Sequence, residues 1–195
     1  MELMLAMSLL AGLLTFTFLI FRMGSNSWKS VEAKAKLQSE MQVATARLTR
    51  EVERSTYASA SLDPPGVGSA CSFACPLDNQ AQVSLNSGSG RPDWHQYLVF
   101  YHNATTRELW FRSLPIGAGD PERTSAEPIE LFDAAGPQPL AFFRNQGKPL
   151  ARWVVGCRFT MSAGLLQGEL AGEHPRSWSA TPERFSLRVV SLFRN

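Results

Sequence analysis

The sequence lacks a surplus of charge of either sign. Its 195 residues include 19 Lys and Arg against 17 Asp and Glu, which leaves a formal net charge of +2. Proteins that bind nucleic acid neutralise phosphates with clustered Lys and Arg, and no such cluster is present. We therefore expect no nucleic-acid partner.

The sequence also lacks the motifs of the common enzyme classes. It has no G-x-S-x-G elbow, no G-x-x-x-x-G-K-[ST] loop, no H-E-x-x-H and no G-x-G-x-x-G after a strand pattern. His95 opens an expected strand close after Asp93, and we expect it to be an ordinary surface or edge histidine. His102 and His174 fall in loop contexts. We predict no catalytic residues, no cofactor, no metal site and no enzymatic activity.

Cysteine is scarce, with Cys71, Cys75 and Cys157 as the only three. Cys71 and Cys75 could close a small loop, or either could pair with Cys157. In an oxidising compartment we expect one disulfide and one spare thiol. Buried free thiols and a metal site are the alternatives.

The chain does contain one long uncharged apolar run, from Leu3 to Phe21, in which only Ser8, Thr15 and Thr17 carry polar side chains. As a helix it would be about 28 Å long, close to the thickness of the hydrocarbon core of a bilayer. It is too long for the apolar region of a signal peptide and predicts a single membrane span. Glu2, at its edge, is costly in lipid, and such residues generally have a function.

The residues from Glu2 to Ala11 resemble the N-terminal segment of mature type IV pilins and type II secretion pseudopilins. In this family an F-T-L-x-E start precedes an apolar helix; Glu2 matches the Glu, and Leu3 to Leu14 match the helix. Met1 occupies the position before the Glu, where the family has its first mature residues after a basic leader ending in Gly. We expect a start upstream of Met1, and prepilin peptidase as a partner if that leader exists.

A second helical pattern follows, from Lys29 to Ala60. Its apolar residues recur every three or four positions and predict one buried stripe, formed by Leu37, Met41, Ala44, Leu48 and Val52. The interval from Arg22 to Trp28 contains Gly24, and we expect a kink or a melted turn there. The predicted organisation is a membrane and assembly helix over 1–22, its amphipathic continuation over 23–60, and a β-rich head over 61–195.

The head reads as a loop over 61–80 followed by short strands separated by turn signals. The expected strands are 82–86, 95–101, 108–114, 129–132, 140–144, 151–161, 165–170 and 184–193. The predicted fold class is α+β, with a long N-terminal helix packed on antiparallel sheet.

Two further stretches are most similar to J-type pseudopilins of type II secretion and W-type minor pilins: Leu48 to Arg54, and the C-terminal end from Val190 to Asn195. The resemblance implies a subunit that assembles with other minor pilins or pseudopilins and with the major subunit. Glu2 would pair with the N-terminal amine of a neighbouring subunit. The expected assembly residues are Glu2, Leu3, Leu5, Ala6, Leu9, Leu10, Gly12 and Leu13.

The resemblance also implies a bacterial inner-membrane location with the head in the periplasm. The basic residues nearest the span all follow it, and a simple positive-inside count would leave the head in the cytoplasm. The family's leader would carry the opposing charge, so we expect a periplasmic head. These residues are Arg22, Lys29, Lys34 and Lys36.

The alternative function is that of a membrane-tethered extracytoplasmic binding module. Aromatic residues of the expected strands would line its site if their rings were exposed. These residues are Trp94, Tyr97, Tyr101, Trp110 and Trp153.

Overall fold

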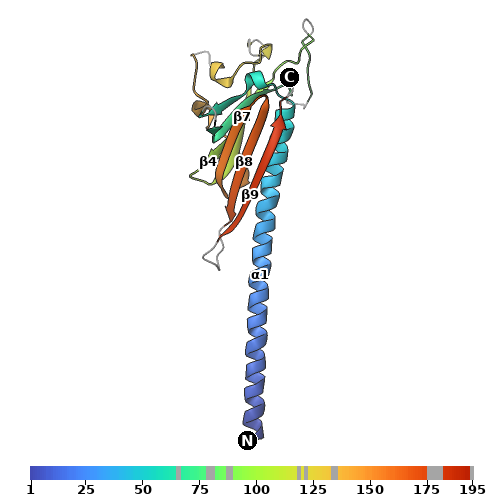
Figure 1. The fold of residues 1–195 in the computed structure, drawn as a ribbon, viewed down its shortest axis with the longest axis vertical. Coiled ribbons are helices and arrows are strands. Elements are labelled where there is room, and N and C mark those ends of the chain that lie inside the picture. The colour runs from blue at the N-terminus through green and yellow to red at the C-terminus, as the bar shows by residue number, and fades with distance from the viewer. Residues whose placement is uncertain are drawn as a thin grey trace.

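The architecture is one long helix laid along a two-sheet head, as seen in a computed structural model (Figure 1). The structure describes residues 1–64, 67–77, 82–86, 90–117, 120, 123–132, 136–174 and 182–193. The N-terminal half of the helix projects from the head, and its C-terminal half runs along the strand nearest to it. This is the predicted α+β class, and its general shape is pilin-like.

Helix α1 (Glu2–Glu53) is continuous over 52 residues. The expected kink or melted turn around Gly24 is not formed, because one helical glycine costs only about 1 kcal/mol and helix propagation on both sides maintains the hydrogen bonds. The membrane half and its amphipathic continuation therefore form a single rod.

The helix ends at Glu53, seven residues before the predicted end at Ala60. The Ser55 hydroxyl donates a hydrogen bond to the Glu51 carbonyl at 2.6 Å, and the Ser55 N–H bonds the Val52 carbonyl at 3.0 Å. These contacts occupy carbonyls that would otherwise continue the helix. A short 3-10 helix, η1 (Tyr57–Ser59), then leads into the first strand.

The head contains two antiparallel sheets. The five-stranded sheet has the order β1 (Ser61–Asp63), β3 (Ala70–Cys75), β4 (Gln96–Asn103), β5 (Glu108–Pro115) and β6 (Lys148–Arg152). The four-stranded sheet has the order β2 (Val67–Gly68), β7 (Val154–Ser162), β8 (Leu165–His174) and β9 (Glu183–Leu192).

The predicted hairpin over 95–114 is confirmed as β4 and β5, paired from Gln96↔Pro115 to Asn103↔Glu108. The predicted strand over 151–161 is divided instead. Trp153 adopts a φ of +62°, which ends β6 and starts β7 in the other sheet. The last strand agrees with its prediction to within one residue.

Four expectations about the middle of the chain are wrong. The predicted loop over 61–80 contains β1, β2 and β3, and β3 is buried along its whole length. The expected strands at 129–132 and 140–144 are 3-10 helices, η3 (Ile129–Leu131) and η4 (Leu140–Phe143). The segment 82–86 forms only isolated bridges, Leu77↔Val83 and Leu85↔Pro92.

The main core lies between α1 and the two sheets. It contains the stripe predicted on the helix, whose five residues are each at most 1% exposed. Phe73, Phe100 and Phe159 meet it from the sheets. A second core lies on the opposite face of the five-stranded sheet, where η3 and η4 cover Tyr97 and Val99.

Candidate assembly and membrane-anchoring surface

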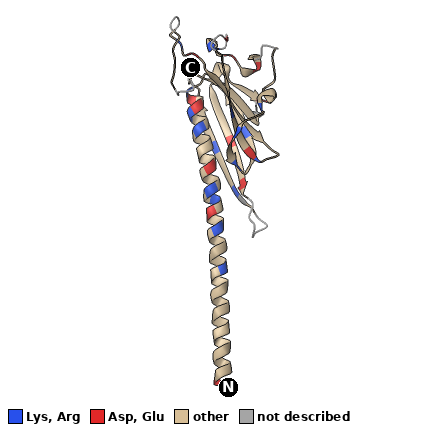
Figure 2. Cartoon of the chain, turned by 180° about the vertical axis from the view of Figure 1, so that it is seen from behind, with Lys and Arg blue, Asp and Glu red and all other residues tan. Residues whose placement is uncertain are grey.

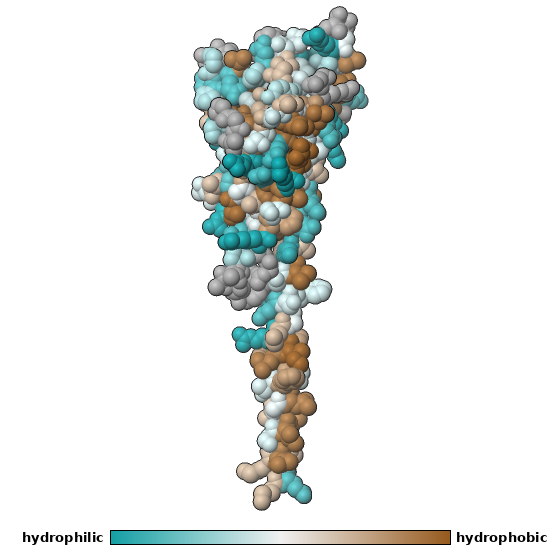
Figure 3. Space-filling model, viewed as in Figure 1, coloured by the Kyte–Doolittle hydropathy of each residue, from teal (hydrophilic) through white to brown (hydrophobic). Residues whose placement is uncertain are grey.

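The N-terminal half of α1 is a free apolar surface. All residues from Met1 to Gly24 are exposed, and Leu3, Leu9 and Leu13 keep 66–76% of their accessible surface. Figure 3 shows this half as a mainly apolar rod, and in Figure 2 it carries charge only at its N-terminal tip, before the first blue residues farther along the helix. The helix is long and apolar enough to cross a membrane. Leaving such a surface in water is unfavourable, so it requires lipid or another apolar surface.

The hydroxyl groups in this half are satisfied within the helix. Ser8 donates to the Leu5 carbonyl, Thr15 to the Ala11 carbonyl and Thr17 to the Leu13 carbonyl, each at 2.8 Å. A polar group without a partner costs several kcal/mol in hydrocarbon. The run therefore presents no unsatisfied hydroxyl to lipid, despite its three polar side chains.

The expected assembly residues do not share one face. At about 100° per residue, Glu2, Ala6, Leu9 and Leu13 form one line along α1, because they are spaced at i, i+4, i+7 and i+11. Leu3 and Leu10 lie on one side of that line, and Leu5 and Gly12 lie on the other. Together the eight residues span about half of the helix circumference, which suits contact with more than one neighbour.

Glu2 occupies the first turn of α1, where its carboxylate faces the positive end of the helix dipole. It is exposed, and the next carboxylate along the chain is Glu32. The structure thus presents a single acid at the tip of an apolar rod. In lipid an acid of this kind is stabilised by pairing with a cation.

The C-terminal half of α1 is fixed to the head by more than its apolar stripe. Oε2 of Glu40 accepts the backbone N–H of Arg152 at 2.9 Å, and the Arg47 guanidinium lies 3.9 Å from the ring centre of Phe111. The sequence pattern places both residues on the polar face, so these contacts were missed. Such contacts hold the rod at a defined angle to the sheets.

The cysteines are all free thiols, and the expected disulfide is not formed. Cys71 and Cys75 face the main core from the same side of β3, and four residues of strand separate them by about 13 Å, too far for a disulfide. Cys157 enters this core from β7. Burial raises the pKa of all three thiols, in the case of Cys75 to about 11.

The histidines have structural partners. The Nε2 atom of His95 lies 2.6 Å from the Ser84 hydroxyl, and that of His102 lies 2.7 Å from the Val154 carbonyl. The His174 ring packs on Trp153. Among the described residues, no group of three or more His, Cys, Asp or Glu is arranged to hold a metal ion.

The aromatic residues considered for a binding site do not form an exposed surface. Trp94, Tyr97 and Tyr101 are at most 8% exposed, and Trp110 is half-buried, with its ring stacked on Tyr101. Trp153 is also half-buried. These rings stabilise the sheets, and the five residues do not form an aromatic face for a ligand.

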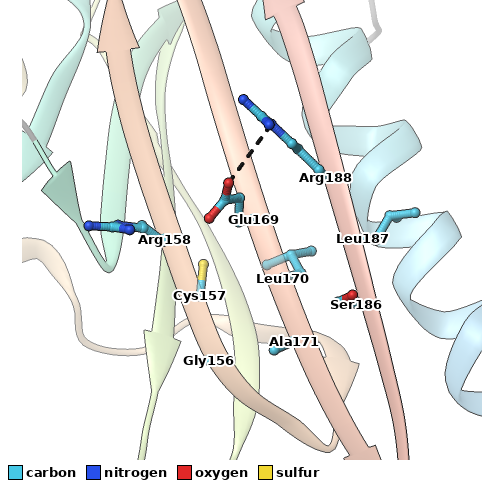
Figure 4. A pocket seen from close by; sticks show the side chains of 9 residues that line it. All are labelled: Gly156, Cys157, Arg158, Glu169, Leu170, Ala171, Ser186, Leu187 and Arg188. Carbon is cyan, nitrogen blue, oxygen red and sulfur yellow. Dashed lines mark ion pairs between the residues drawn. The ribbon is translucent and has the colours of Figure 1, made fainter.

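A shallow hollow lies on the outer face of β7, β8 and β9 (Figure 4). Arg188 pairs with Glu169 across it at 3.8 Å, and Gln167 bonds both side chains. Its lining includes the small residues Gly156, Ala171 and Ser186. The hollow offers ionic and hydrogen-bonding contacts through these side chains.

Comparison with known proteins identified no relative. No protein-family model matches the chain, and no match was found among curated proteins or solved structures.

Proposed function

We propose that this protein is a minor pilin or pseudopilin subunit, anchored in the bacterial inner membrane with its head in the periplasm. It assembles with other pilin-like subunits and with the major subunit to initiate or cap a type IV pilus or a type II secretion pseudopilus. The observation that carries the proposal is the division of α1 into a free apolar half and a half docked on antiparallel sheets.

This division fits an assembly subunit better than a simple tether. A tether needs an apolar helix and a flexible connection, whereas α1 passes from the free half into the docked half without a break. A rigid connection transmits the position of the head to the apolar rod. Subunits stacked through their rods would therefore hold their heads in a fixed arrangement.

Glu2 sets the axial register between neighbouring stacked subunits. In the family that the N-terminus resembles, an acid at this position pairs with the N-terminal amine of the neighbouring subunit. In an apolar surrounding such a pair is strong, and an unpaired carboxylate costs several kcal/mol. The pairing thus favours one axial offset between neighbouring rods over all others.

The decisive experiment replaces Glu2 with Ala in the native gene and measures piliation or protein secretion. We expect loss of assembly with unchanged protein in the membrane fraction, because the head does not contact Glu2. Glu32→Ala is the matched control, since Glu32 is an exposed acid on the same helix outside the apolar run. Normal piliation and secretion in the Glu2→Ala strain would refute the assembly role.

The alternative, a tethered binding module, has less support. The five aromatic residues that would have lined its site are buried or half-buried. A ligand site elsewhere on the head would leave the Glu2→Ala strain functional, so the same experiment separates the two proposals.

A further inference from the structure

Three of the four strands at the edges of the two sheets are poorly suited to pairing with another chain. Strands β1 and β2 contain only three and two residues. Strand β6 begins with the exposed Lys148, contains Pro149 and pairs with β5 through an irregular register at Leu109 and Trp110. Short edge strands, lysine, proline and bulges are devices by which sheets avoid association through their edges.

The fourth edge strand, β9, has none of these devices. All ten of its residues pair with β8 in one unbroken register, and they include neither proline nor lysine. In the same register the Phe193 N–H bonds the Gly164 carbonyl at 2.9 Å. Because hydrogen-bonded pairs alternate along an antiparallel ladder, the main-chain groups of every second residue of β9 point away from β8. These residues are Arg184, Ser186, Arg188, Val190 and Leu192.

The outward main-chain groups of β9 have no hydrogen-bond partner among the residues that the structure describes. The side chains beside them are exposed as well, with Val190 at 54% and Leu192 at 60%. An exposed strand with a row of unpaired N–H and C=O groups is a template for one more strand.

A groove lies along this free side of β9, between the strand and α1, which run next to each other in Figure 1. On the helix its lining includes the short side chains of Thr45, Ala46 and Thr49. On the strand it includes Leu187 and Val189, which are only half-buried. The helix therefore runs beside the edge of β9 without closing it.

We infer that β9 and this groove bind an extended segment of a partner protein, which adds to the four-stranded sheet as an antiparallel strand next to β9. In this mode of recognition the main-chain hydrogen bonds supply affinity and alternate side chains supply specificity. The inference goes beyond the proposed assembly through α1, because neither Glu2 nor the apolar half of the helix lines the groove.

The charge of β9 indicates the chemistry of the partner segment. From Arg184 to Leu192 the strand carries two arginines, four residues apart on the outer face, and no acid. On the β8 side these arginines pair with Glu173 and Glu169, and their side chains remain 78% and 64% exposed. Acids on the other side would extend both pairs across the sheet, since cross-strand pairs of opposite charge are stabilising.

The partner segment therefore alternates acidic or polar residues with small apolar ones. Its apolar side chains face the groove, where Ala46 and Thr49 leave room for them. A second copy of β9 is a poor occupant, because it would bring the arginines of both copies to one face without an acid between them.

The experiment measures binding of a fluorescein-labelled peptide, T-V-E-V-T-V-E-V-T, to the full chain in detergent micelles by fluorescence anisotropy. Its acids are spaced as the two arginines are. Replacing both acids with lysine should weaken binding by about fivefold. N-methylation of the Thr and Glu amides, which point toward β9, should abolish binding. N-methylation of the Val amides, which point away from β9, should change it by less than about threefold.

Two variants of the protein test the site itself. Val190→Pro removes an N–H that points away from β8, a position where an edge strand tolerates proline, and should weaken binding by about tenfold. Ala46→Arg places a long side chain in the groove and should have an effect at least as large. Val43→Arg is the matched control, because Val43 is exposed on the same helix and does not line the groove.

Three results would overturn the inference: no binding of the peptide to the wild type, equal binding of both N-methylated peptides, or equal binding by the Ala46→Arg and Val43→Arg variants. Glu2→Ala should bind the peptide as the wild type does. Peptide binding by a Glu2→Ala chain with normal piliation and secretion would refute the assembly role and leave the strand-binding site standing. Absence of binding to the wild type, with piliation or secretion lost in the Glu2→Ala strain, would refute only the strand-binding site.

Discussion

Gly172 of β8 lies so close to Leu37 of α1 that a Cβ atom added to it would be 2.7 Å from the Leu37 Cδ1 atom. The same Cβ would be 2.7 Å from the Met41 sulfur. Glycine at this position therefore allows the helix to approach the four-stranded sheet. The docking of the rod depends on an absent side chain as well as on those that fill the core.

Gly172→Ala should lower the free energy of unfolding of the head by about 1–3 kcal/mol, the usual cost of overpacking a core. Leu37 and Met41 have flexible ends, which keeps the cost in this range. Gly156→Ala is the matched control, because its added Cβ would meet only Ala171 at an ordinary 3.6 Å. Denaturant unfolding of the detergent-solubilised chain measures the stability of both variants. Equal stability of the two would contradict the close approach of α1 to Gly172.

The buried stripe of α1 should supply most of the energy that holds the rod on the head. Leu48 is 1% exposed, and Leu48→Ala should destabilise the head by about 2–5 kcal/mol through lost burial and a cavity. Val43, 61% exposed on the same helix, should tolerate Ala within about 0.5 kcal/mol. The same unfolding measurement applies, and a Leu48 variant as stable as the Val43 variant would contradict docking through this stripe.

The sequence predicted the helix, its buried stripe and the C-terminal strands because each has a clear period. It did not predict β3, whose small uncharged residues on both faces show no alternation between polar and apolar. The 3-10 helices at Ile129 and Leu140 carry short apolar runs that resemble strands, and only the preceding prolines, Pro128 and Pro139, hint at a turn.

The apolar surface of the N-terminal half of α1 was also predictable. An uncharged run with one acid at its edge can be recognised in a single sequence. Its continuation into an amphipathic half docked on the sheets was predicted as well, and only the expected kink or melted turn at Gly24 was wrong. Gly24 and its polar neighbours favour a break locally, but helical hydrogen bonds on both sides outweigh that preference. The free state of the cysteines depends on which strand face each thiol occupies, and this could not be predicted once β3 had been missed.

The free thiols should make the head less stable at alkaline pH. Burial, assisted by the charge of nearby Glu51, raises the pKa of Cys75 from 9.0 to about 11. The unfolded state therefore ionises first, and stability present below pH 9 is lost as the pH rises toward 11, by at most about 2–3 kcal/mol. Unfolding free energies across this range, compared between the wild type and Cys75→Ala, measure the effect. Identical alkaline losses in both proteins would contradict a buried protonated thiol at this position.

Gly12 should be required for assembly and not for folding. A Cβ added to Gly12 would meet no atom within 4 Å, so no contact within the chain explains a glycine that costs the helix about 1 kcal/mol. Small residues in apolar helices allow neighbouring helices to approach closely. Gly12→Leu should leave unfolding of the head unchanged and lower piliation or secretion by about tenfold, the effect of roughly 1.4 kcal/mol of lost helix packing. Gly24→Leu is the matched control, because Gly24 also faces open space but lies beyond the apolar run. Equal losses of piliation or secretion in both variants would point to a general requirement for glycine in the rod. Normal piliation and secretion in both would remove Gly12 from the assembly surface.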